Sequence, residues 1–154
     1  MSNLADNDRF QVLHGWVPGD SATITRTFDV ALNGGVPEAL EPGMLVMLDG
    51  SGDAIPAATP ATAKSIYLVV EGNVVDTSTQ SFADLVHKVA CVRGSVTITT
   101  PRFDTGAAIV AGSPLSYANG LLTLQLAGTD QLVGYAESVD TTVGSEKLVA
   151  ELTL

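Results

Sequence analysis

The chain has 154 residues, of which 17 are Asp or Glu and 7 are Lys or Arg, so its formal net charge at pH 7 is −10. This shortage of bases argues against binding to nucleic acid or to anionic membranes, because both kinds of binding depend on Lys and Arg. The 45% of hydrophobic residues suffice for a core and exclude a disordered acidic chain, while two His and one Cys leave little material for a metal or redox site.

The first 22 residues differ in composition from the rest of the chain. Acids and amides dominate residues 3–8, and isolated large apolar residues then follow up to Pro18 and Gly19. Such a segment cannot form a core of its own, so it docks either on its own domain or on a partner. Because a Pro-Gly pair indicates a break in the chain, we favour a partner-binding arm over residues 1–22. Acids stand where a secretory signal would carry bases, which favours a cytoplasmic origin.

Residues 23–154 are expected to form one all-β domain. Residues 23–30 alternate with a period of two, since the odd-numbered positions are Thr or Asp and three of the four even-numbered ones are apolar. Short apolar runs at 44–48 and 66–70 are typical of strands buried on both faces of a small barrel. Fifteen Gly and seven Pro imply frequent turns. The only helix candidate is 81–88, of at most two turns, and a strand over 86–92 fits the same region equally well.

A weak internal repeat links the two halves of this domain. Residues 42–70 and residues 111–136 each contain a Gly-led strand, a tight hairpin, a second strand, a spacer and a third strand. The strongest hairpin signal is Asn119-Gly120, because both central residues of a type I′ turn need positive φ.

Few residues suggest chemistry. Asp104 begins an Asp-Thr-Gly tripeptide that looks like the active-site motif of aspartic peptidases, but a single copy would work only in a homodimer, and the same tripeptide is common in turns. Residues 49–53 space three oxygen side chains like the start of a calcium loop, yet the Gly and Glu positions of that loop are not matched, so we expect a hairpin turn. Cys91, in an apolar stretch, is expected to be a buried and inert thiol.

The second half of the chain combines four features. They are an Arg-Gly that ends one strand at 93–94, a Thr-rich strand that closes in Phe103, a Gly-led strand and hairpin, and a Val-Gly-Tyr-Ala strand at 133–136. In these features about residues 66–154 resemble the head decoration, or capsid cement, proteins of tailed bacteriophages. It implies a small β-barrel or β-tulip domain at 23–154, with an extended N-terminal arm and at most one short helix.

The resemblance also implies a function. The chain would be a structural virion protein and not an enzyme, would bind the outer surface of the expanded capsid as a homotrimer and would stabilise it, after being made in the host cytoplasm. Its partners would be the major capsid protein and its own copies, with no cofactor, nucleic acid, membrane or small-molecule substrate. The predicted capsid-binding residues of the arm are Arg9, Phe10, Leu13, Trp16 and Val17. The alternatives are another phage subunit, from a tail tube or baseplate, and a homodimeric aspartic peptidase that uses Asp104.

Overall fold

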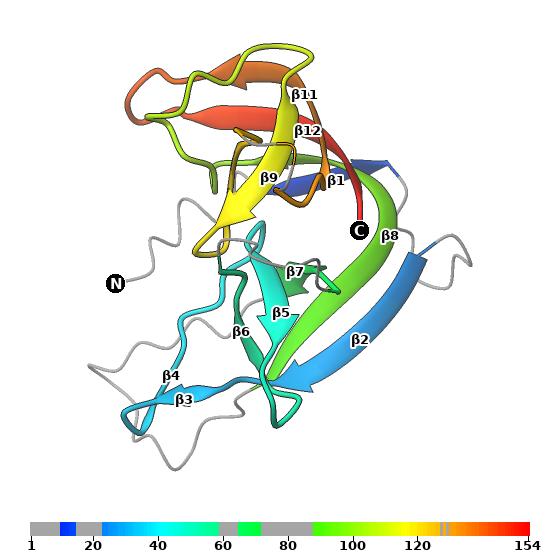
Figure 1. Ribbon diagram of the computed structural model, residues 1–154, viewed down its shortest axis with the longest axis vertical. Helices are drawn as coiled ribbons and strands as arrows, with labels where there is room; N and C mark the ends of the chain where they lie inside the picture. The colour runs from blue at the N-terminus through cyan, green and yellow to red at the C-terminus, as the bar shows by residue number, and fades with distance from the viewer. Residues whose placement is uncertain (1–9, 15–22, 59–64, 72–87, 127, 129) are drawn as a thin grey trace.

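The computed structural model describes residues 10–14, 23–58, 65–71, 88–126, 128 and 130–154 (Figure 1). The described residues contain no helix, and the all-β prediction is confirmed. Residues 81–87 of the helix candidate lie outside the described residues, and its last residue, Lys88, begins strand β8. The strands are β1 (Gln11–His14), β2 (Thr23–Asp29), β3 (Leu32–Asn33), β4 (Val36–Pro37), β5 (Leu45–Leu48), β6 (Ala54–Pro56), β7 (Tyr67–Glu71), β8 (Lys88–Thr100), β9 (Pro114–Ala118), β10 (Leu121–Leu124), β11 (Gly134–Asp140) and β12 (Lys147–Thr153).

Strand β8 organises the fold, because it pairs antiparallel with four other strands. Its first half pairs with β2 and β7, and its second half pairs with β1 and β12. Gly94 lies where the partners change and has a φ of 134°, a value that residues with side chains rarely adopt. The prediction that Arg93-Gly94 ends a strand is wrong, since glycine lets β8 continue through this point. Figure 1 shows the strong curvature of β8.

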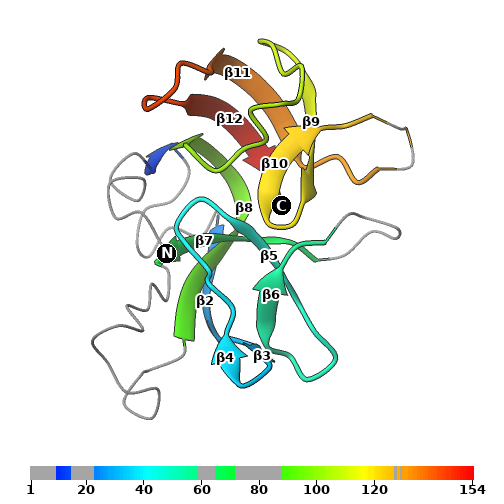
Figure 2. The same ribbon diagram turned by 90° about the vertical axis from the view of Figure 1, so that its left-hand side faces the viewer.

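The sheet curls into two barrel-like halves on this shared strand (Figure 2). In one half the strands follow the order β2-β8-β7-β5-β6, and a parallel bridge between Val30 and Ala54 joins the end of β2 to β6. In the other half the order is β8-β12-β11-β9-β10, and a parallel bridge between Phe103 and Leu122 joins the segment after β8 to β10. The expectation of a small barrel-like domain is therefore met.

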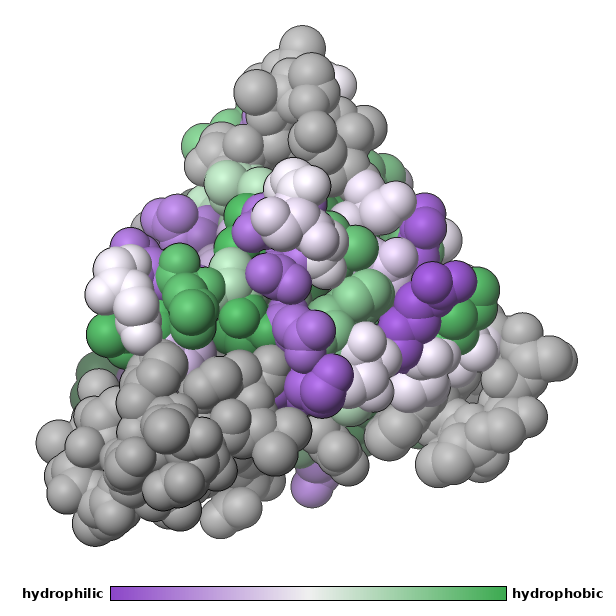
Figure 3. All heavy atoms as spheres, turned by 90° about the horizontal axis from the view of Figure 1, so that it is seen from below, coloured by the Kyte–Doolittle hydropathy of each residue, from purple (hydrophilic) through white to green (hydrophobic). Residues whose placement is uncertain are grey.

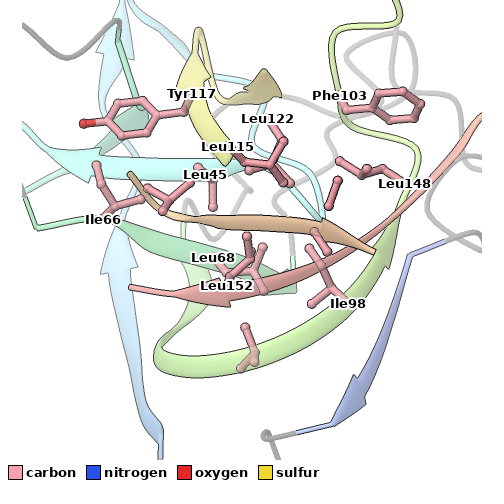
Figure 4. Close-up of a cluster of buried hydrophobic side chains, with 14 of the residues drawn as sticks. Leu45, Ile66, Leu68, Ile98, Phe103, Leu115, Tyr117, Leu122, Leu148 and Leu152 are labelled. Atoms are coloured by element: carbon pink, nitrogen blue, oxygen red, sulfur yellow. The ribbon is translucent and has the colours of Figure 1, made fainter. Parts of the chain in front are cut away.

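The buried side chains form two hydrophobic clusters. The larger cluster lies between the β9–β12 sheet and one face of the β5–β7 sheet, and Figure 4 shows ten of its side chains by name. The smaller cluster lies on the other face of the β5–β7 sheet, where Phe28 meets Tyr67 edge-to-face at 4.9 Å between ring centroids. The members of the smaller cluster are Val30, Leu40, Met44, Val46, Ala54, Tyr67, Val69, Val89 and Cys91, with Phe28 and Leu48 at its margin. Strands β5 and β7 are thus buried on both faces, as their continuous apolar runs predict.

The internal repeat predicted from the sequence is present in the sheet. In the first unit β5 pairs with β6 and β7, and β7 pairs with β8; in the second, β9 pairs with β10 and β11, and β11 pairs with β12. The Gly43 N–H donates to the Val69 carbonyl (2.9 Å), and the Gly112 N–H donates to the Ala136 carbonyl (2.7 Å) in the same way. A register shift directly follows Val69 in the first unit and Ala136 in the second. The two units therefore share the glycine turn before their first strand, their strand pairings and their bulge.

The tip of the β9–β10 hairpin ties the two halves together. Gly120 accepts a hydrogen bond from the Leu45 N–H (2.8 Å) and donates one to the Ala57 carbonyl (2.9 Å). Asn119 and Gly120 have φ values of 50° and 81°, as a type I′ turn requires. The hairpin signal in the sequence is confirmed, and it marks a contact between the two repeat units.

Cys91 gives a test of the smaller cluster. Its side chain is fully buried, and burial raises the pKa of the thiol from 9.0 to about 12. Because the thiolate is the reactive form, we expect native Cys91 to react with a disulfide reagent about a thousandfold more slowly than Cys91 of urea-unfolded protein. The folded state holds this proton more tightly, so the contribution of the thiol to stability falls as the pH rises from 9.0 toward 12. If the native protein were labelled quickly while the Cys91→Ser variant was not labelled, the prediction of an inert thiol would be wrong.

Candidate functional site

Strands β1 and β2 form an edge of the sheet, which we call the N-terminal edge. Both run antiparallel to β8 along successive stretches, with Gln11 opposite Thr99 and Asp29 opposite Lys88. Within the described part of the chain, neither strand pairs with any strand other than β8. A strand edge of this kind presents backbone donors and acceptors that can pair with another chain.

Side chains of β1 alternate between the core and the exterior, whereas residues 24–27 of β2 are all exposed. Phe10 and Val12 pack against the larger cluster. Leu13 and Ile24 are 52% and 55% exposed. The edge therefore combines open backbone with isolated apolar side chains, which is the combination that strand addition by a partner uses.

The predicted anchors of the arm fall into three groups. Phe10 lies against its own core, and Leu13 points outward. Arg9, Trp16 and Val17 lie outside the described residues. The structure thus brings part of the predicted arm onto its own sheet, and Leu13 is the predicted anchor that it exposes.

A buried ion pair lies beneath the start of this edge. Arg102 and Glu41 meet at 2.8 Å, and each side chain is only 12% exposed. Gly43 leaves room here, because a Cβ atom at this position would collide with the Thr100 hydroxyl and would lie 3.0 Å from the ring of Phe10. The side chains of Phe10 and Arg102 both lie against Gly43, so the ion pair stands beside the beginning of β1.

A second exposed apolar feature is the β3–β4 hairpin. Leu32 and Val36 are 57% and 52% exposed, on a two-stranded hairpin that projects from the lower end of the molecule in Figure 1. Figure 3 views the molecule from that end and shows apolar side chains beside polar ones on its surface. The sequence reasoning did not select this hairpin, although Asn33-Gly34 is a signal for one.

A third feature is a groove on the outer face of β11 and β12. It has a volume of about 360 Å³ and is lined by Leu132, Val133, Gly134, Tyr135, Glu151 and Thr153. The repeat explains why this face is open. Tyr135 and Glu151 occupy the positions that Leu68 and Val92 hold in the first unit, where the second unit covers them. Nothing in the described chain covers the second unit in the same way, and Tyr135 is 52% exposed.

The polar motifs of the sequence form turns. The Asp104 carboxylate accepts a hydrogen bond from the Gly106 N–H (2.9 Å), and the Asp49 carboxylate accepts from the N–H groups of Ser51 (2.8 Å) and Asp53 (3.0 Å). The hairpin turn predicted for residues 49–53 is confirmed, and the peptidase interpretation of Asp104 gains no support from its geometry. Among the described residues, no group of three or more His, Cys, Asp or Glu side chains could hold a metal ion. The same residues include no helix that is long and apolar enough to span a membrane.

Comparisons with known proteins found no relative of this chain. No protein-family model, no curated protein and no solved structure matches the chain.

Proposed function

We propose that this chain is a structural virion protein that decorates and stabilises the expanded capsid of a tailed phage, binding its outer surface as a homotrimer. The observation that carries the proposal is the N-terminal edge, whose strands pair only with β8 among the described strands and which bears the outward side chains of Leu13 and Ile24. An edge strand with exposed apolar side chains is a hazard for a protein that remains alone, and such edges are normally covered or charged. A partner that adds a strand here would cover it.

The surface charge supports the same proposal. A net charge of −10 suits the outer face of a shell filled with DNA, whereas a protein beside packaged DNA would carry bases. The resemblance of residues 66–154 to decoration proteins covers strands β7 to β12, the part of the fold that carries the second repeat unit. Binding that favours the expanded shell over its precursor would stabilise the expanded form by mass action alone.

The proposal is tested by mixing the purified protein with expanded and unexpanded heads of the phage that encodes it. We expect electron microscopy to show binding to expanded heads and little binding to unexpanded ones. Light scattering of the free protein should give three times the 15.9 kDa mass of one chain. Equal binding to both kinds of head would contradict decoration, and a ring or filament in solution would favour the tail-tube alternative.

The N-terminal edge itself is tested by charge insertion. Leu13→Asp and Ile24→Asp should each weaken co-sedimentation with expanded heads by about 30-fold, the effect of losing one interface hot spot. Val143→Asp is the matched control, because Val143 is 93% exposed in the loop between β11 and β12. Circular dichroism checks that all three variants are folded. Wild-type binding by both edge variants would show that decoration, if it occurs, uses another surface.

A further inference from the structure

The chain contains two Asn-Gly pairs, and both lie at type I′ hairpin turns. In the β3–β4 hairpin the turn residues are Gly34 and Gly35, with φ values of 62° and 82°, and Asn33 directly precedes them. In the β9–β10 hairpin the turn residues are Asn119 and Gly120 themselves. The same dipeptide thus occurs at two hairpin turns of one molecule, one position earlier in the β3–β4 turn than in the β9–β10 turn.

The two glycines differ in what surrounds them. Gly34 is exposed, nothing lies within 4 Å of the position where a Cβ would stand, and its N–H donates to no acceptor in the described chain. Gly120 is buried, and its N–H donates to the Ala57 carbonyl at 2.9 Å. A Cβ on Gly120 would lie only 2.7 Å from the methyl carbon of Met44. The first glycine is thus not held by any contact at its Cβ position or through its N–H in the described chain, and the second is held between the two repeat units.

This difference matters for a reaction that needs no enzyme. The backbone nitrogen that follows an Asn can attack the side-chain amide carbon, forming a C–N bond and expelling ammonia to give a five-membered succinimide. Water then adds to either carbonyl of the ring and opens it to aspartate or isoaspartate. A following glycine favours the attack because it has no side chain to block it and the widest range of φ and ψ. A nitrogen whose N–H is held in a buried hydrogen bond cannot approach the amide without breaking that bond.

We propose that Asn33 is a site of spontaneous deamidation in the folded protein and that the fold protects Asn119 from the same reaction. Each event at Asn33 replaces a neutral amide by a carboxylate and adds one negative charge between the exposed side chains of Leu32 and Val36. An isoaspartate also lengthens the backbone within a two-residue strand. The hairpin tip therefore changes from apolar to charged as the protein ages, whatever partner the chain has.

The test compares the two sites in one sample. Cleavage after Lys and Arg yields peptide 27–64, with Asn33 as its only Asn, and peptide 103–147, with Asn119 as its only Asn. The intact folded protein is kept at neutral pH and 37 °C, and mass spectrometry follows the mass increase of each peptide. We expect peptide 27–64 to convert about tenfold faster or more, because the buried hydrogen bonds of Gly120 must open first. In urea the two rates should converge.

A control variant assigns the site. Asn33→Gln should abolish the mass increase of peptide 27–64, since the longer side chain would have to close a six-membered ring. Equal rates at the two sites in the folded protein, or faster conversion of Asn119, would overturn the proposal. So would a stable peptide 27–64 in the folded protein.

Discussion

Replacing Gly134 by Val is expected to lower the free energy of unfolding by about 3 kcal/mol or more, the upper end of overpacking costs. Gly134 lies opposite Leu152 in the β11–β12 pair. A Cβ atom at this position would collide with the backbone carbonyl of Glu151 and would lie 2.9 Å from both Cα and Cδ2 of Leu152. Two of these three atoms belong to the backbone of a central strand, so rotation of a side chain cannot relieve the overlap.

The measurement is thermal or urea unfolding with a matched glycine control. For a domain of this size a loss of 3 kcal/mol corresponds to a fall in Tm of about 6–12 °C. Gly50→Ala is the control, because nothing lies within 4 Å of its Cβ position and its φ is not in the left-handed region. We expect that change to alter stability by less than about 0.5 kcal/mol. A Gly134→Val protein as stable as the control would mean that β11 and β12 lie farther apart than in this structure.

The second large effect is expected at the ion pair between Arg102 and Glu41. Arg102→Met should cost about 3–5 kcal/mol, because it leaves the Glu41 carboxylate nearly buried without its cation. The double variant Glu41→Leu/Arg102→Met should recover most of this loss, since apolar residues often replace a buried pair without cost. A large loss in Arg102→Met that the double variant recovers would come from the unpaired Glu41 carboxylate, because a simple loss of packing would remain in the double variant.

An exposed ion pair in the same protein supplies the control. Lys88 and Asp29 also meet at 2.8 Å, but their side chains are 54% and 64% exposed. Lys88→Met should therefore cost less than about 1 kcal/mol. If Arg102→Met and Lys88→Met gave the same small loss, or if the double variant were no more stable than Arg102→Met, the buried pair would not be a support of the fold.

The strands and their repeat could be predicted because their signals are local. Alternation revealed β2, apolar runs revealed β5 and β7, and Asn119-Gly120 fixed the β9–β10 hairpin. The continuity of β8 could not be predicted, since Gly94 can end a strand or bend one. Which of these occurs depends on partners that are distant in the sequence.

The candidate docking surfaces were harder to predict for the same reason. Whether Phe10 or Leu13 faces outward depends on the register of β1 against β8, and a slip of one residue would exchange the two faces. Tyr135 lies in a strand that resembles β7, and only the packing of the units decides that it is exposed while Leu68 is buried. The β3–β4 strands have two residues each, too few for alternation to show.

The pairing of β1 with β8 also sets an order of events during synthesis. Val12 lies opposite Ile98, so 86 residues must be added after Val12 before its partner exists. At about 5–20 residues per second, the nascent chain spends roughly 4–17 s in this state. The larger cluster also needs β11 and β12, which follow β8 in the chain. Strand β1 is thus translated before the other described strands, yet its partner strand and the cluster that Val12 packs against are completed only after most of them have followed.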